Sequence, residues 1–109
     1  MIVFQNKYFI PYNFSGVCKV LVDGSIRYYQ NGLFHREDGP AIISENGDKS
    51  FFIKGLRHRE DGPAFEGVNG AKMWCYRGEI YGKSTDFNCK TWAKFAQALK
   101  YKESLEIFK

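Results

Sequence analysis

A seven-residue segment occurs twice in the chain, and its spacing constrains the fold more than any other feature of the sequence. The segment His-Arg-Glu-Asp-Gly-Pro-Ala (HREDGPA) occupies residues 35–41 and again residues 58–64, an offset of 23 residues. The same offset relates Gly32 to Gly55. A fixed period of this length is typical of a stacked or meandering array, in which each repeat buries its apolar face against its neighbours.

The residues between the two copies predict β-hairpins. Asn-Gly and Asp-Gly pairs are strong hairpin-turn signals because both residues tolerate a positive φ. Such pairs stand at residues 23–24, 31–32, 46–47 and 69–70. Runs rich in aromatic and β-branched residues predict strands over 25–30, 49–53 and 72–76. Return strands are expected over 17–22, 41–45 and 64–68.

These elements predict one mainly β domain, an antiparallel β-meander of tandem 23-residue hairpin repeats with one C-terminal α-helix packed on it. Apolar residues make up 44% of the 109-residue chain, which is more than a disordered chain carries. The predicted parts are a degenerate half-repeat (1–22), two repeats (23–45 and 46–68), a partial repeat (69–83) and a helical cap (84–109).

The aromatic residues occupy matching positions in successive repeats. Tyr28, Phe51 and Trp74 stand at one position, and the next position holds Tyr29, Phe52 and Cys75. Neighbouring residues of a strand face opposite sides of a sheet. We therefore expect one interior ladder of side chains on each side of the sheet.

The repeat unit reads approximately aromatic-Tyr-x-Asn-Gly-x-x-His-Arg-x-Asp-Gly-Pro-Ala, and over residues 15–82 it resembles the variant units of the MORN repeat family. The resemblance implies a meandering β-sheet that serves as a scaffold for protein interactions or lies beside membranes. It also implies a source among phages, giant viruses or bacteria. Typical MORN units carry Gly directly after the His, where this chain has Arg36 and Arg59.

The C-terminal segment predicts an amphipathic helix that begins near residues 84–86 or at Asn88, which are good N-cap residues. An apolar stripe follows i, i+3, i+4, i+7 spacing at Trp92, Phe95, Ala96 and Leu99, and we expect it to be buried against the sheet. Residues 1–66 hold eight basic and eight acidic residues, whereas residues 67–109 hold eight and four, so the net charge of +4 lies in the second part.

The HREDGPA segment contains residue types that can carry out acid–base chemistry, but its duplication indicates a structural rule. An Asp-Gly-Pro sequence favours a turn, and the arginines can pair with nearby carboxylates. A metal site would need His35 and His58 together with a third ligand that the sequence does not specify. We therefore predict no enzyme activity, no cofactor and no metal.

The predicted function is that of a protein–protein interaction module, an accessory protein of a phage or bacterium that binds and inhibits one host or cellular protein. Positions that break the repeat are the best candidates for partner binding: Tyr76, Arg77, Glu79, Tyr81, Lys90 and Lys94. The alternative is a nucleic-acid-binding accessory protein that uses the basic helix, through Lys90, Lys94, Lys100 and Lys102. An enzyme built around His35 or His58 is a third hypothesis.

The three cysteines show no C-x-x-C spacing, which favours a reducing compartment. No export leader and no membrane-spanning run is visible in the sequence. The expected location is therefore the cytoplasm, and the host cytoplasm if the protein is encoded by a phage. Open sheet edges would also allow homo-oligomers.

Overall fold

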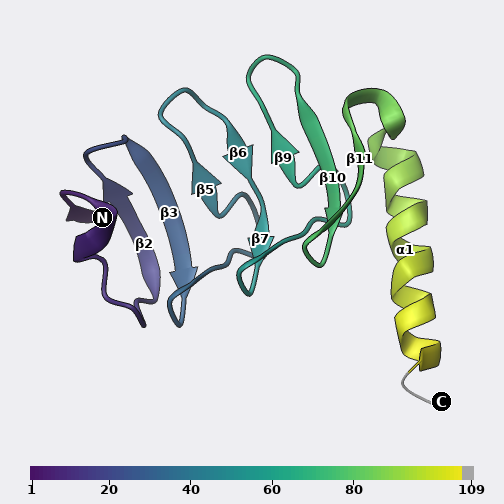
Figure 1. Cartoon of the computed structure of the whole chain (residues 1–109), viewed down its shortest axis with the longest axis horizontal. Coiled ribbons are helices and arrows are strands. Elements are labelled where there is room, and N and C mark those ends of the chain that lie inside the picture. Colours follow the sequence, from purple (N-terminus) through teal and green to yellow (C-terminus); the bar gives the residue numbers. More distant parts are fainter. Residues whose placement is uncertain (107–109) are drawn as a thin grey trace.

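The computed structural model describes residues 1–106 and consists of one long sheet with a helix at its far end (Figure 1). Its extents are 45 × 36 × 18 Å. The strands are β1 (Ile2–Phe4), β2 (Gly16–Val20), β3 (Ser25–Gln30), β4 (Leu33–Phe34), β5 (Ile42–Ile43), β6 (Lys49–Ser50), β7 (Phe52–Ile53), β8 (Leu56–Arg57), β9 (Phe65–Glu66), β10 (Lys72–Tyr76) and β11 (Glu79–Lys83). The helices are two 3₁₀ turns, η1 (Lys7–Phe9) and η2 (Ser84–Asp86), and α1 (Cys89–Glu106).

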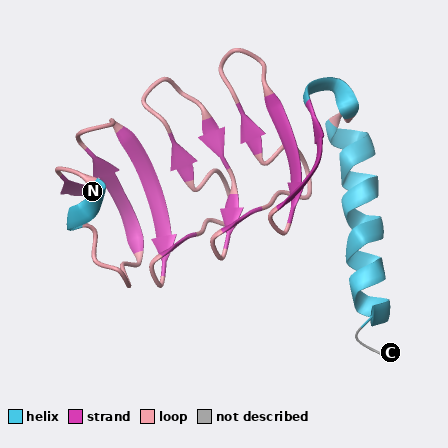
Figure 2. Cartoon of the chain, viewed as in Figure 1, coloured by secondary structure: helices cyan, strands magenta, loops and turns pink. Residues whose placement is uncertain are grey.

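The strand order confirms the predicted meander. The main sheet runs β1-β2-β3-β5-β6-β9-β10-β11, with β4 paired to β3, and β7 and β8 form a separate two-stranded ribbon. Figure 2 shows the predominance of strands and the single long helix. One pair departs from the antiparallel prediction, because β1 runs parallel to β2. Residues 5–15, which include η1, form the crossover that a parallel pair requires.

The predicted strands over 25–30 and 72–76 match β3 and β10, whereas the strand predicted over 49–53 is split into β6 and β7. The break falls at Phe51, whose N–H donates to the carbonyl of Ala64 at 2.7 Å. The return strands β5 and β9 are also shorter than predicted, with two residues each. Each of them follows a loop that ends in Pro-Ala, and proline has no N–H to donate to a strand ladder.

Three tight turns join the hairpins at residues 31–32, 54–55 and 77–78. Both residues of each turn have positive φ, as in type I′ turns: 52° and 79°, 49° and 80°, and 48° and 86°. Only the first turn has the Asn-Gly pair that predicts this geometry, while Lys54 and Arg77 adopt it in the other two. A side chain at Gly32 would also collide with the carbonyl oxygen of Tyr12.

The helix begins after Asn88, one of the predicted caps. The Asn88 side chain accepts from the Thr91 N–H at 2.9 Å, and the Thr91 hydroxyl oxygen accepts from the Asn88 N–H at 2.9 Å. This reciprocal pair satisfies two backbone groups that a helix start would otherwise leave without a partner. The last three residues of the predicted cap, 107–109, lie outside the described residues.

The buried stripe of α1 is narrower than the predicted one. Trp92 and Ala96 are fully buried and Leu99 is half-buried, as predicted. Phe95 was predicted to be buried but is 36% exposed, because it lies at the rim of the contact, where its ring packs 5.3 Å from that of Tyr81. The helix is docked chiefly by Trp92, whose ring lies 5.9 Å from that of Trp74 in the same core cluster.

Candidate functional site

The two histidines of the HREDGPA loops occupy equivalent positions and make equivalent contacts. The Nδ1 atom of His35 accepts a hydrogen bond from the backbone N–H of Lys54 at 2.9 Å. The Nδ1 atom of His58 accepts one from the N–H of Arg77, also at 2.9 Å. Both donors are the first residue of the next unit's tight turn. Each histidine therefore holds the turn of the following repeat in place.

The second ring nitrogen of each histidine faces a carboxylate of its own loop. His35 Nε2 lies 3.6 Å from Glu37, and His58 Nε2 lies 3.2 Å from Glu60. Since Nδ1 is an acceptor, the neutral ring carries its proton on Nε2. Neither nitrogen then offers a lone pair to a substrate or a metal ion.

The arginine of each loop lies flat on the aromatic ring of its own unit. The Arg36 guanidinium is 4.0 Å from the centre of the Tyr28 ring, a cation–π distance. Its Nε donates to Asp38 at 3.0 Å and its Nη1 donates to the carbonyl of Pro40 at 3.2 Å. The Arg, Asp and Pro of the repeated segment thus form one local cluster.

The second loop repeats this cluster and adds a partner. Arg59 lies 4.1 Å from the Phe51 ring centre and donates to Asp61 at 2.9 Å and to the Pro63 carbonyl at 3.2 Å. It also donates to Glu66 at 2.7 Å. These contacts repeat those of the first loop at an offset of 23 residues.

The glycine of each loop leaves room for the arginine. A Cβ atom at Gly39 would lie 2.8 Å from Cζ of Arg36, and one at Gly62 would lie 2.8 Å from Cζ of Arg59. The His, Arg and Asp of the repeated segment therefore have structural partners in both loops, and the glycine allows their close packing.

A groove of about 700 Å³ runs between the two loops. We call the side of the sheet that carries the loops and α1 the loop face. The charged residues of the groove are four carboxylates and five cations: Glu37, Asp38, Glu60 and Asp61, with Arg36, Lys54, Arg59, Arg77 and Lys100. One cation, Lys100, comes from α1 and lies 3.7 Å from Glu60. The helix therefore closes one side of the groove.

Two of the predicted partner-binding residues lie in this groove. Arg77 is exposed at its edge and pairs with Glu103 of α1 at 3.1 Å. Tyr76 is only 4% exposed, so it is a core residue and not the surface residue that the sequence suggested. Its hydroxyl donates to Glu103 at 3.2 Å and its ring lies 4.7 Å from that of His58. Burial, followed by the contact with Glu103, raises the pKa of the Tyr76 phenol.

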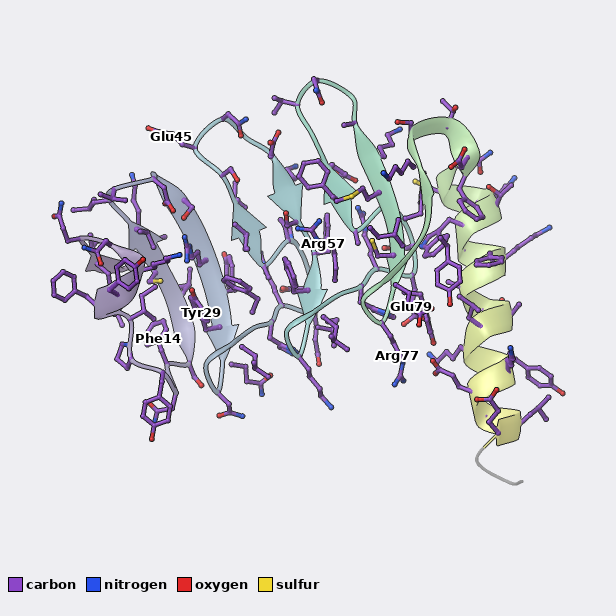
Figure 3. The ribbon with its side chains drawn as sticks, viewed as in Figure 1. Phe14, Tyr29, Glu45, Arg57, Arg77 and Glu79 are labelled. Carbon is purple, nitrogen blue, oxygen red and sulfur yellow. The ribbon has the colours of Figure 1, made fainter. Side chains whose placement is uncertain are left out.

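The other four predicted residues lie outside the groove. Glu79 and Tyr81 belong to β11, where the Tyr81 hydroxyl donates to the Glu79 carboxylate at 3.0 Å. Lys90 and Lys94 are exposed on α1. Figure 3 shows Arg77 and Glu79 near the lower end of the hairpin that β10 and β11 form. The structure thus joins Tyr76 and Arg77 to the loops and leaves the remaining four apart from them.

Sequence reasoning missed the part that α1 plays in the groove. Lys100 and Glu103 lie one helical turn apart and both reach the groove region, through Glu60 and through Arg77. In the sequence, Lys100 and Glu103 are spaced from Trp92 and Ala96 so that they fall beside the buried stripe of the helix. This spacing was the signal that could have placed them near the sheet. What the sequence did not contain was the direction in which α1 crosses the sheet.

Within residues 1–106, no three His, Cys, Asp or Glu side chains lie close enough together to hold a metal ion. No helix in that range has the length and apolar character needed to cross a membrane. A scan against protein-family models found no match to this chain, and neither did searches of curated proteins and of solved structures.

Proposed function

We propose that this chain is a non-catalytic protein-interaction module that binds one cellular or host protein at the groove of the loop face and thereby inhibits it. The observation that carries the proposal is the groove itself. Two loops and a helix surround it, and its arginines and Lys100 are each paired with a carboxylate of the protein. A surface that is already ordered loses little conformational entropy on binding.

The composition of the groove supports a protein partner. The groove carries charges of both signs, and the arrangement of such charges gives an interface its orientation and specificity. Arg59 and Arg77 lie beside apolar residues, and arginine is enriched where binding energy concentrates. The partner best suited to this groove is a protein segment with charges of both signs.

The contacts of the loops also support a non-catalytic role. A general base needs a lone pair that is available to the substrate, and in each loop the Nδ1 lone pair of the histidine already accepts a hydrogen bond from a backbone N–H. The same arrangement occurs twice, so a reaction assigned to one loop must be assigned to the other.

The test begins with affinity capture of the partner from the native cell and continues with binding measurements on charge variants. Lys54→Glu combined with Lys100→Glu reverses two exposed charges of the groove. Lys90→Glu combined with Lys94→Glu makes the same change in net charge on the exposed side of α1. We expect the groove variant to weaken binding at least about tenfold and the helix variant to bind like the wild type.

The opposite result, with binding lost only in the helix variant, would place the interface on α1 and refute the groove. If the captured material is nucleic acid and its salt-sensitive retention is lost in the helix variant, the alternative function of the basic helix replaces the proposal. Thermal unfolding of both variants shows whether each remains folded.

A further inference from the structure

The face of the sheet opposite the loops carries a row of aromatic rings that the proposed function does not use. Successive ring centres lie 5.6 Å (Phe4–Phe14), 5.8 Å (Phe14–Tyr29), 4.9 Å (Tyr29–Phe34) and 5.2 Å (Phe34–Phe52) apart. Figure 3 shows Phe14 and Tyr29 on neighbouring segments near the amino-terminal end of the sheet.

Two arginines lie among these rings. The guanidinium of Arg27 is 5.9 Å from the Phe34 ring centre, and that of Arg57 is 5.2 Å from Phe52 and 5.8 Å from Phe65. We call this surface the aromatic–arginine face. It combines cations with planar rings on strands of the main sheet and on the ribbon of β7 and β8.

A hollow of about 470 Å³ opens at the amino-terminal end of this face. Its lining consists of Lys7, Tyr8, Ile10, Pro11, Tyr12, Arg27, Tyr29, Gly32, Leu33, Phe34 and Gly55. Tyr8 is 84% exposed and Tyr12 is 92% exposed, so both rings project into solvent beside the half-buried rings of Tyr29 and Phe34. Large exposed rings that gather at one hollow mark a binding surface.

The charge around the hollow is positive. Its lining contains two cations, Lys7 and Arg27, and no carboxylate. Arg27 shares its charge with Asp23, which lies 2.8 Å away. Lys7 and Arg57 have no ion pair within residues 1–106.

The distribution of the acidic residues explains this local excess of positive charge. Residues 1–66 are neutral as a whole, but four of their eight carboxylates line the groove of the loop face. Glu66 pairs with Arg59 on that same face. The fold therefore places five of the eight carboxylates of residues 1–66 on the loop face, away from the lining of the hollow.

We infer that the hollow and the aromatic–arginine face bind single-stranded nucleic acid. The exposed rings of Tyr8 and Tyr12 provide platforms on which unpaired bases stack. Lys7, Arg27 and Arg57 attract the phosphates. Stacking platforms beside cations are the common arrangement in proteins that bind single strands without sequence preference.

The same observations disfavour two other occupants. A duplex keeps its bases stacked inside and could not use the exposed tyrosine rings. A proline-rich peptide would use aromatic rings, but it has no repeating negative charge to match the cations, and it would depend on tyrosine hydroxyls as donors. Both are included in the test as competing probes.

The experiment measures fluorescence anisotropy of a labelled oligothymidylate of about 12 nucleotides with the full chain at about 50 mM salt. We expect saturable binding that weakens as salt is raised. Tyr8→Ala combined with Tyr12→Ala should weaken the binding at least about tenfold, because both rings on which bases stack are removed. Tyr8→Phe combined with Tyr12→Phe should bind like the wild type, because stacking needs the ring and not the hydroxyl.

Tyr101→Ala is the matched control, since Tyr101 is 66% exposed on α1 and far along the chain from the hollow. Free thymidine monophosphate should compete poorly, and an equal length of duplex should compete less well than the single strand. An oligouridylate of equal length shows whether RNA is also bound.

Three results would overturn the inference. The first is no saturable binding up to about 100 μM protein, the weak limit of non-specific association. The second is binding that the Tyr8 and Tyr12 alanine variant retains but Lys90→Ala combined with Lys94→Ala loses. The third is tyrosine-dependent binding of a labelled oligoproline in place of the oligonucleotide.

Discussion

The two faces of the sheet are built from the same strands, yet their side chains are held in different ways. On the loop face the guanidinium groups of Arg36 and Arg59 are each fixed by a carboxylate, a carbonyl and an aromatic ring. On the opposite face Arg57 contacts only rings among the described residues. The charges of these two loop arginines are paired within the protein, whereas Arg57 has no ion pair within residues 1–106, and this difference separates the proposed protein interface from the proposed nucleic-acid surface.

The largest effect is expected where α1 meets the loop face. Trp92→Ala removes a fully buried indole and its 2.7 Å hydrogen bond to the carbonyl of Arg59, so it should destabilise the chain by roughly 3–5 kcal/mol. Urea unfolding followed by circular dichroism measures the change. Lys94→Ala, on the exposed side of the same helix, should change the stability by less than about 0.5 kcal/mol. Equal stability of the two variants would show that α1 is not docked.

The corresponding change on the aromatic–arginine face should have a smaller effect. Phe34→Ala removes a half-buried ring that contacts Tyr29, Phe52 and Arg27, and we expect a loss of roughly 2–3 kcal/mol. Its neighbour Leu33 is 50% exposed, so Leu33→Ala should cost under about 1 kcal/mol in the same denaturation assay. A loss at Phe34 as large as that at Trp92 would mean that both faces are equally well packed.

The crowding between glycine and arginine can be isolated with a double-mutant cycle. Gly62→Ala should destabilise the chain by roughly 1–2 kcal/mol, because the new Cβ displaces the Arg59 guanidinium from its ring and its acceptors. In an Arg59→Ala background the same glycine change should have almost no effect. An unchanged cost in that background would point to backbone strain instead of crowding.

The two histidines offer a matched pair within the loop face. His58→Ala and His35→Ala each remove an acceptor for the next unit's turn, and each should lower the free energy of unfolding by about 1 kcal/mol. The His58 substitution should lower the stability more than the His35 substitution, because the His58 ring also lies 4.7 Å from that of Tyr76. Thermal unfolding of the two variants gives the order, and a reversed order would contradict the contribution of the ring contact.

The smallest effect concerns Asp23, which pairs with Arg27. The hydrogen bond from the Ser25 hydroxyl is the main cause that lowers the pKa of this carboxyl below its ordinary value of 3.8. The nearby Arg27 guanidinium lowers this pKa as well. A lowered folded-state pKa means that the charged carboxylate stabilises the fold above its unfolded pKa, and that this contribution is lost as the pH falls through the folded value. When the pH falls from neutral to about 3, the Asp23→Asn variant should therefore lose less stability than the wild type. Parallel acid titrations of the two proteins would reveal a difference, and identical curves would contradict the shift.

Local signals predicted most of the fold. The Asn-Gly pair at 31–32 and the glycines that follow at 55 and 78 mark three hairpin turns that the structure contains. The stripe through Trp92 and Ala96 identified the buried side of α1. Such features depend on residues close together in the chain, which is why a sequence alone displays them.

The parts that could not be predicted depend on contacts between units. Nothing in the local sequence around His58 indicates that its Nδ1 accepts a hydrogen bond from the N–H of Arg77, 19 residues away. Likewise, Tyr76 looked like a surface residue because it breaks the repeat, but α1 brings Glu103 over it. The placement of five of the eight carboxylates of residues 1–66 on the loop face also escaped a count along the chain, since that count mixes residues that point in opposite directions.

The histidine of one unit accepts a hydrogen bond from the turn of the next unit, and this contact makes the array modular. Because donor and acceptor recur at the same offset, a copy of residues 46–68 inserted after residue 68 would meet the loop of the second repeat on one side and the third unit on the other. The protein should therefore lengthen in whole units, each adding one more inter-loop groove. Such a chain would carry its proposed binding grooves at regular intervals. A partner with contacts at the same spacing would then favour a matching number of units.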